Sequence, residues 1–176
     1  MGGEALMVTE AIEPTEPFEP SEPVETADTG ATFEDLWAER RAGLLRLAYL
    51  LTGSRAVAED VVQDAFVQLH RRWDSVRVPA PYLRTSVVNG CRMHHRRNSR
   101  EQARFADLVT DTVQPETSVV LDALAHLPYP QRAALVLRYY EDRPEAEIAE
   151  LLGCRPATVR SHVHRGLAAL REAMDQ

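Results

Sequence analysis

Arginine is the residue type whose number and spacing point most directly to chemistry in this sequence. All 20 basic residues are Arg, and none is Lys. Between residues 82 and 104, polar side chains recur at the three- and four-residue spacing of one helix face, namely Asn89, Arg92, Arg96 and Arg100, with Arg97 nearby. No acid interrupts this stripe before Glu101. Guanidinium groups gathered in this way bind the phosphates of nucleic-acid backbones, so the stripe predicts a nucleic-acid-binding helix.

A second set of polar side chains lies near the C-terminus. A short helix is expected between Pro144 and Gly153, because Pro suits a first turn and Gly suits the position just past a last one. A second helix is expected to open at Pro156, and the two helices across this tight turn form a helix-turn-helix. Its apolar stripe consists of Val159, Val163, Leu167 and Leu170. Off that stripe lie the side chains that a recognition helix presents to base edges and phosphates, namely Arg160, Ser161, His164 and Arg165. A plain helical hairpin with solvated arginines is the alternative.

Metal and catalytic chemistry find little support in the residues. Cys91 with His94 and His95 suggests zinc, but the chain has no matching second pair of ligands, so we expect no metal and no other cofactor. No constellation suits nucleophilic, metal or paired-carboxylate catalysis, and we expect no enzymatic activity. The two cysteines, Cys91 and Cys154, are too far apart in the sequence to imply a disulfide framework. Without a signal peptide pattern or an apolar run of about 20 residues, the sequence predicts a cytoplasmic protein.

The elements that must position these side chains are all predicted to be helices, in two small units. In the first unit we expect helices from an N-cap at Thr32 to a stop at Gly53, from residue 55 to residue 73, and from residue 82 to residue 104. In the second unit, helices near residues 119–127 and 131–140 precede the helix-turn-helix. The loop at residues 74–81 is bracketed by Trp73 and Tyr82. These two aromatic side chains are either caps on the core or stacking platforms for unpaired bases.

One face of the second expected helix is polar and mainly acidic. It carries Glu59, Asp60, Gln63 and Asp64, opposite a side that bears Val62, Ala65 and Phe66. A solvated helix surface has the same pattern, and the residues alone favour that interpretation over an interaction face.

Charge is distributed very unevenly along the chain. The formal net charge is -7, but eight of the 27 acids and none of the bases lie in residues 1–31. The remaining 145 residues therefore carry 19 acids against 20 bases, a net of +1. The first 31 residues repeat Glu-Pro pairs and are predicted to be a disordered acidic tail. The tail is either a solubilising segment or a competitor of DNA for the arginine faces.

From Phe33 to the C-terminus the chain resembles the extracytoplasmic-function sigma factors, and among them the actinobacterial SigE-like group. In the first unit the resemblance rests on LTGSRAVAEDVVQDAFVQLHRRW and PYLRTSVVNGCRMHHRR. In the second it rests on LDALAHLPYPQRAALVLRYYEDRPEAEIAELLGCRPATVRSHVHRGLAALR. It implies an all-α fold in which a region 2-like domain (32–104) and a region 4-like helix-turn-helix domain (118–176) follow the tail (1–31) and are joined by a flexible linker (105–117).

The resemblance also implies partners and site residues. Its partners would be core RNA polymerase and promoter DNA, with an anti-sigma factor as a further partner that family membership allows. Glu59, Asp60, Gln63 and Asp64 would contact the core enzyme, which reverses the interpretation of that face as merely solvated. The minus-ten element would be melted and held by Trp73, Tyr82, Asn89, Arg92, Arg96 and Arg97, with Asn89 reading a base. The minus-thirty-five element would be read by Thr158, Arg160, Ser161, His164 and Arg165.

Two positions depart from the family pattern. Tyr82 stands where Trp is frequent, and Pro156-Ala157 stands where Gly often precedes Thr in the recognition helix. Two other functions stay open from the sequence. One is a stand-alone regulator with a LuxR-type helix-turn-helix, which leaves the first arginine helix unexplained. The other is an interaction protein that sequesters a partner through its acidic face, which leaves both basic helices without a role.

Overall fold

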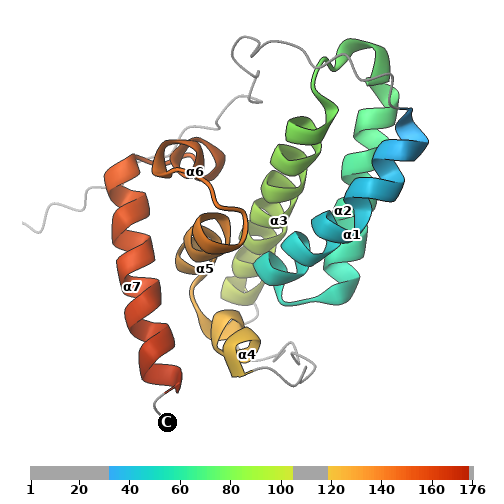
Figure 1. Ribbon diagram of the computed structural model, residues 1–176. Coiled ribbons are helices and arrows are strands. Elements are labelled where there is room, and N and C mark those ends of the chain that lie inside the picture. Colours follow the sequence, from blue (N-terminus) through green and yellow to red (C-terminus); the bar gives the residue numbers. More distant parts are fainter. Residues whose placement is uncertain (1–31, 105–118, 175–176) are drawn as a thin grey trace, which may run out of the picture.

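The computed structural model describes residues 32–104 and 119–174 of the 176-residue chain, with the side chains of residues 100–104 excepted. The expected tail (1–31) and the expected linker (105–117) lie outside the described residues. Within them every regular element is a helix, which confirms the all-α prediction. The N-terminal helices are α1 (Phe33–Thr52), α2 (Arg55–Arg71) and α3 (Pro79–Arg104). The C-terminal helices are α4 (Val119–His126), α5 (Tyr129–Leu135), α6 (Glu145–Leu152) and α7 (Pro156–Met174) (Figure 1).

Local signals set the ends of the first helices. Thr32 and Asp35 form a capping box, in which Asp35 N–H donates to Thr32 Oγ1 at 3.2 Å and Thr32 N–H donates to Asp35 Oδ2 at 3.0 Å. These hydrogen bonds from the Thr32 side chain and backbone lower the pKa of Asp35. Gly53 ends α1 in the left-handed conformation at φ 73°, and Ser54 caps α2. The predicted N-cap and stop are therefore confirmed.

Two segments differ from the sequence-based expectation. α3 begins at Pro79, three residues before the expected start at Tyr82, because a proline is well tolerated in a first helical turn. The loop before it is accordingly shorter and holds a 3-10 turn at Trp73–Ser75. The helix expected at residues 131–140 begins at Tyr129 and widens into a π-helical turn at Val136–Tyr140. Periodicity located both helices but not these irregularities.

The core of the N-terminal helices is an interleaved set of aliphatic side chains around Phe66. Leu47, Leu51 and Val87 are all fully buried with it. Gly90 lets α3 approach α2 closely, because a Cβ at residue 90 would lie only 2.8 Å from Val61 Cγ1. In the C-terminal helices, Leu137, Ile148 and Val159 are fully buried and fix the helix-turn-helix on α5.

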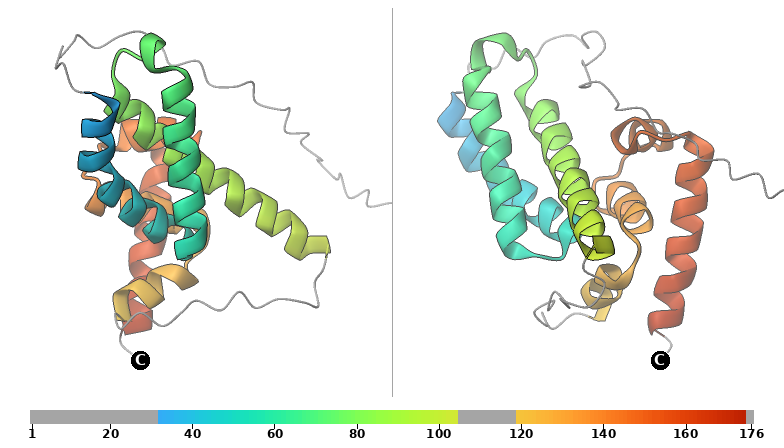
Figure 2. Two further views of the ribbon diagram at one scale, coloured as in Figure 1. Left: turned by 90° about the vertical axis from the view of Figure 1, so that its right-hand side faces the viewer. Right: turned by 180° about the vertical axis from the view of Figure 1, so that it is seen from behind.

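The two groups of helices pack against each other. α6 lies against α3, while α4 and α5 lie against α1, and the buried apolar residues of both groups form one continuous cluster. The C-terminal end of α3 projects beyond the body of the molecule (Figure 2). Of the helices that the structure describes, none combines the length and the apolar character needed to cross a bilayer.

Candidate nucleic-acid interface

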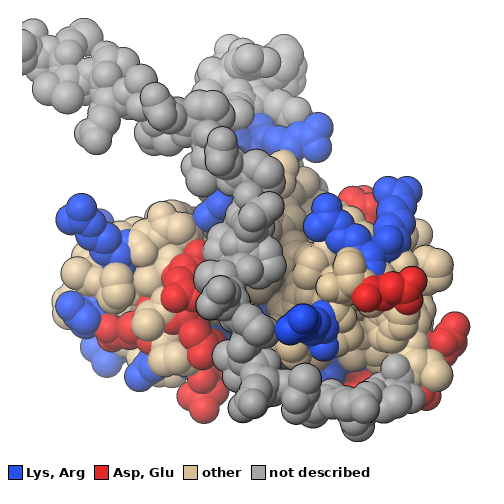
Figure 3. Space-filling view, turned by 90° about the horizontal axis from the view of Figure 1, so that it is seen from above, with Lys and Arg blue, Asp and Glu red and all other residues tan. Residues whose placement is uncertain are grey.

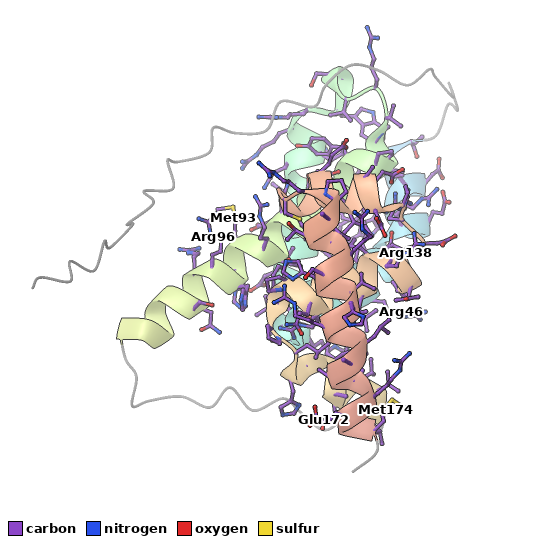
Figure 4. All side chains as sticks on the ribbon, turned by 90° about the vertical axis from the view of Figure 1, so that its left-hand side faces the viewer. Arg46, Met93, Arg96, Arg138, Glu172 and Met174 are labelled. Atoms are coloured by element: carbon purple, nitrogen blue, oxygen red, sulfur yellow. The ribbon has the colours of Figure 1, made fainter. Side chains whose placement is uncertain are left out.

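The arginine stripe of α3 is divided between two environments. Arg96 is exposed and projects outward from the helix together with Met93, whose side chain is 62% exposed (Figure 4). Asn89 is half-buried and precedes Arg96 by seven residues, which places both on the same outer face. Arg97 is exposed on the next flank of the helix. The outer face of α3 therefore offers an amide and a guanidinium to solvent.

Arg92 also contacts the C-terminal helices. It is half-buried, and its Nη1 atom lies 2.9 Å from where a Cβ at Gly153 would stand, so it packs on the turn that joins α6 to α7. Its Nε atom is buried without a hydrogen-bond partner. Arg92 is thus half-buried like Asn89, but unlike the exposed Arg96 it packs against the C-terminal helices.

The two aromatic side chains beside the loop are partly buried. Trp73 packs its ring at 83° against Phe33, with 5.5 Å between the centroids. Tyr82 is half-buried and also packs on the core cluster. Trp73 thus packs on the start of α1, Tyr82 packs on the core from α3, and both residues are only partly buried.

Several polar side chains meet where the N-terminal and C-terminal helices pack, a zone that we call the seam. It comprises Arg84, Arg92 and His95 of α3, together with Tyr129, Arg132 and Glu141 from the C-terminal half, and Arg92 reaches the backbone turn at Gly153. Arg84 Nε donates to Glu141 Oε2 at 2.6 Å, and the His95 ring stacks on Tyr129 with 4.7 Å between centroids. Burial, and then the charges of Arg132 and His94, lower the pKa of His95.

Arg132 is the most buried charged side chain at the seam, with 8% exposure. Its Nη1 atom lies 3.4 Å from where a Cβ at Gly53 would stand, and its Nε atom has no hydrogen-bond partner. Burial lowers the pKa of Arg132 and raises that of Tyr129. Sequence reasoning missed both Arg132 and Glu141. A signal in the sequence was that Arg132 shares a helical face with Tyr129 and Val136, an aromatic and an aliphatic residue.

The recognition helix α7 presents its predicted polar residues to solvent. Arg160, Ser161, His164 and Arg165 are exposed, whereas Thr158 is half-buried near the start of the helix. Arg160 Nη1 donates to Glu145 Oε2 on α6 at 2.9 Å, and Arg165 Nη2 donates to Ser161 Oγ at 3.1 Å. These contacts hold both guanidinium groups over the outer face of α7, where they can donate to acceptors in a groove.

The acidic residues of α2 are also accessible. Glu59, Asp60, Gln63 and Asp64 are all exposed, and Glu59 accepts a hydrogen bond from Arg55 Nε at 3.1 Å. The face lies opposite the buried side of α2 that carries Ala58, Val62 and Phe66. Seen from above the molecule, basic and acidic side chains are mixed on the parts of the surface that are visible to either side of the grey atoms (Figure 3).

The surroundings of Cys91 do not favour metal binding. Its side chain is fully buried, and burial raises its pKa to about 12, so that the thiolate a metal requires is strongly disfavoured. Among the described residues, no group of three or more His, Cys, Asp or Glu side chains is arranged to hold a metal ion.

The exposed polar faces of α3 and α7 lie on two separate helical groups, an arrangement that suits a nucleic-acid-binding protein. Comparison with known families gives this class its name. Residues 36–101 match the model of sigma-70 region 2, and residues 118–170 match that of sigma-70 region 4. An RNA polymerase sigma-E factor of Streptomyces avermitilis is 32% identical in an alignment of 152 positions that covers 81% of this chain and 85% of the relative. The ECF RNA polymerase sigma factor SigL of Mycobacterium tuberculosis is 33% identical over 172 residues, covering 85% and 93% of the two chains.

The fold agrees with these relatives. The sigma factor RpoE of Bartonella quintana, solved in complex with the anti-sigma factor NepR, has a TM-score of 0.68 at 23% identity over 81% of this chain and 96% of that one. The chain belongs to the extracytoplasmic-function sigma factors, and it is a promoter-recognising sigma factor of RNA polymerase. A stand-alone regulator is not favoured, because the match includes region 2 as well as the helix-turn-helix.

Proposed function

We propose that this sigma factor divides its work among three helices: α2 binds core polymerase, the outer face of α3 holds the melted minus-ten strand, and α7 reads the minus-thirty-five duplex. The observation that carries this proposal is the pair of exposed arginine-bearing faces on separate helices, Arg96 and Arg97 on α3 and Arg160 and Arg165 on α7. A single-site regulator needs only one such face.

The minus-ten strand fits the outer face of α3. A single strand is held by phosphate contacts together with stacking of its bases, and a base turned out of the duplex is read through its exposed edge. In this assignment Asn89 reads a base, Arg96 and Arg97 hold phosphates, and Trp73 and Tyr82 border the strand where α3 begins. Arg92, which lies one helical turn from both Asn89 and Arg96, adds a further phosphate contact.

The minus-thirty-five duplex fits α7. Its exposed face offers arginine, serine and histidine side chains, which are the donors and acceptors that read base edges in a major groove. We assign base and phosphate contacts there to Thr158, Arg160, Ser161, His164 and Arg165. Glu145 positions Arg160 through their 2.9 Å hydrogen bond before DNA arrives.

Core polymerase binding is assigned to α2. Glu59, Asp60, Gln63 and Asp64 form an exposed face of carboxylates and an amide that suits a basic surface on a protein partner. The contacts assigned to this protein are binding contacts, so we infer that it makes and breaks no covalent bond and works in the cytoplasm, beside the polymerase and the chromosome. An anti-sigma factor is a further proposed partner, because relatives of the same fold are solved in complex with one.

Run-off transcription with core polymerase and promoter fragments from the host genome tests the proposal. We expect specific transcripts only when the protein is added, and we expect them to be lost in the double variant Asp60→Ala with Asp64→Ala. The matched control is Asp122→Ala with Glu150→Ala, which removes two exposed carboxylates elsewhere. Equal activity of the two double variants would contradict the assignment of α2. Duplex binding without any transcript would contradict the proposed function itself.

A further inference from the structure

One large apolar side chain lies among the polar residues on the outer face of α3. Of the large apolar side chains that the structure describes on this helix, Met93 alone is exposed, with 62% of its surface open to solvent. It does not belong to the apolar cluster that joins the two helical groups. A single exposed apolar side chain is common on protein surfaces, so the neighbours of Met93 decide what it can do.

Helical spacing sets the neighbours of Met93. Asn89 lies four residues before it, and Arg96 and Arg97 follow at three and four residues, so all four share one face of α3. Figure 4 shows Met93 and Arg96 on the same side of the helix, both pointing away from the other helices. The thioether of Met93 therefore lies between an amide and two guanidinium groups.

The charged groups on this face do not by themselves favour a melted strand. Guanidinium groups bind backbone phosphates, and a duplex carries phosphates more densely than a single strand does. The two forms of DNA differ in their bases, whose faces are stacked in a duplex and become open to apolar and aromatic side chains in a separated strand. A helix that prefers the melted strand therefore gains from an apolar side chain beside its phosphate contacts.

Methionine has the properties that such a contact requires. Its side chain is unbranched, with three rotatable bonds and a polarisable sulfur that makes favourable contacts with aromatic rings. It can adapt to the face of any base, whereas Asn89 is assigned to the edge of one particular base. The rings of Trp73 and Tyr82 pack on the core cluster instead, which restricts how far they can adjust to a base.

We propose that Met93 is a strand-selective contact, whose thioether packs on the face of an unpaired base of the minus-ten strand while Arg96 and Arg97 hold adjacent phosphates. The inference rests on the proposed function, because it concerns the strand that the outer face of α3 holds. It goes beyond that function by naming the side chain that distinguishes a separated strand from a duplex. Met93 belongs to none of the site groups expected from the sequence.

The test uses holoenzyme formed from core polymerase and the full chain. Its two probes are the fluorescent non-template minus-ten strand of a host promoter and the same sequence as a duplex. We expect Met93→Ala to weaken strand binding about fivefold and to leave duplex binding unchanged, because only an unpaired base offers its face. Met93→Leu keeps an apolar side chain of similar volume and should bind like the wild type, whereas the polar Met93→Gln should bind like Met93→Ala.

Further variants and probes make the result specific. Met174→Ala removes a methionine that is 55% exposed at the end of α7, and it should change neither affinity. Arg96→Ala removes a phosphate contact and should weaken binding to both strand and duplex. On a series of strands that each lack one base, the effect of Met93→Ala should vanish where the contacted base is missing, a coupling that a double-mutant cycle isolates.

The outcomes separate this inference from the proposed function. If Arg96→Ala weakens strand binding but Met93→Ala does not, or if Met93→Ala weakens binding to both probes equally, the inference is overturned while α3 remains the strand-binding helix. If neither variant alters strand binding, the assignment of the strand to α3 fails and the inference fails with it. A selective loss in Met93→Ala without any effect of Arg96→Ala supports the base contact and removes only the phosphate role of Arg96.

Discussion

At the scale of single residues, Arg160 is the side chain on α7 best prepared to read a base. Its hydrogen bond to Glu145 fixes the guanidinium before DNA binds. We expect Arg160→Ala to lower discrimination against one substituted base pair in the minus-thirty-five element by about 1–3 kcal/mol, because a bidentate arginine contact depends on the base. Competition binding with duplexes that carry single substitutions measures this loss.

The matched control for that prediction is Arg171→Ala. Arg171 is exposed in the last turn of the same helix, so its removal changes the charge equally but leaves the predicted reading residues intact. We expect it to weaken binding to all duplexes alike. A uniform loss in Arg160→Ala as well would show that Arg160 contacts phosphate only and reads no base.

Many of the exposed site residues could be predicted from the sequence. The exposed side chains of α7 follow directly from the apolar stripe, because one face of an amphipathic helix fixes the other. The contact of Arg92 with the C-terminal helices could not be predicted. Its spacing to Asn89 and Arg96 is local information, whereas its contact at Gly153 involves a residue 61 positions further along the chain. Periodicity carries no information about which distant element covers a helix flank.

At the scale of helices, replacing two glycines that lie inside helices by alanine should have opposite effects on the free energy of unfolding. Gly90 sits where α3 approaches α2, and a Cβ there would lie 2.8 Å from Cγ1 of Val61, a β-branched side chain with little freedom to move. We expect Gly90→Ala to lower the free energy of unfolding by about 1–3 kcal/mol through overpacking. Urea unfolding followed by circular dichroism gives this quantity.

The control is Gly43→Ala in α1. Gly43 is exposed, and nothing stands within 4 Å of where its Cβ would be. Alanine there should raise the free energy of unfolding by about 1 kcal/mol, since glycine in a helix interior costs that much relative to alanine. Stabilisation by both substitutions would contradict the tight contact between α2 and α3.

The contact between α3 and α5 should depend on pH through His95. Burial, Arg132 and His94 lower the pKa of His95 from its usual 6.5, so the closed seam favours the neutral imidazole. Above about pH 6.5 His95 is neutral whether or not the seam is formed, so the packing of the seam does not change with pH. As the pH falls below that value, an exposed His95 takes up a proton before the buried one does, and the seam should loosen. Scattering measured as a function of pH should show expansion on the acid side.

His95→Phe provides the comparison for this pH dependence. Phenylalanine can keep the stacking on Tyr129 but cannot be protonated. Arg92, Arg132, Cys91 and Tyr129 remain in place around it, so the difference between the two proteins isolates the titration of residue 95. Equal acid expansion of wild type and variant would assign the effect to another group.

At the scale of the whole molecule, charge separates the chain into two parts. Residues 1–31 contain eight acids and no base, and the rest of the chain has a net charge of +1 within a total of -7. The N-cap at Thr32, the stop at Gly53 and the approximate positions of the helices followed from capping and periodicity, because these are local effects. The packing of the C-terminal helices on α1 and α3 did not, because it depends on pairs such as Arg84 and Glu141 that no local pattern links.

We predict that deleting residues 1–31 increases the affinity for promoter duplex by about tenfold at low ionic strength. This factor is at the low end of the effects that long-range electrostatic repulsion or attraction has on association. Eight negative charges on the same chain repel DNA and compete with it for arginine side chains. At ~1 M salt the Debye length falls to about 3 Å, and the gain should disappear. Fluorescence anisotropy over a salt series measures both limits.

Two control proteins separate charge from sequence in this prediction. Replacing the eight acids of residues 1–31 by Gln or Asn keeps the length and should reproduce the effect of the deletion. Shuffling residues 1–31 keeps the charge and should leave the affinity of the wild type. If the deletion binds DNA no better than the intact chain at any salt concentration, the acidic segment does not compete with DNA, and the net charge of +1 on the remaining residues already determines the attraction of the protein to its promoter.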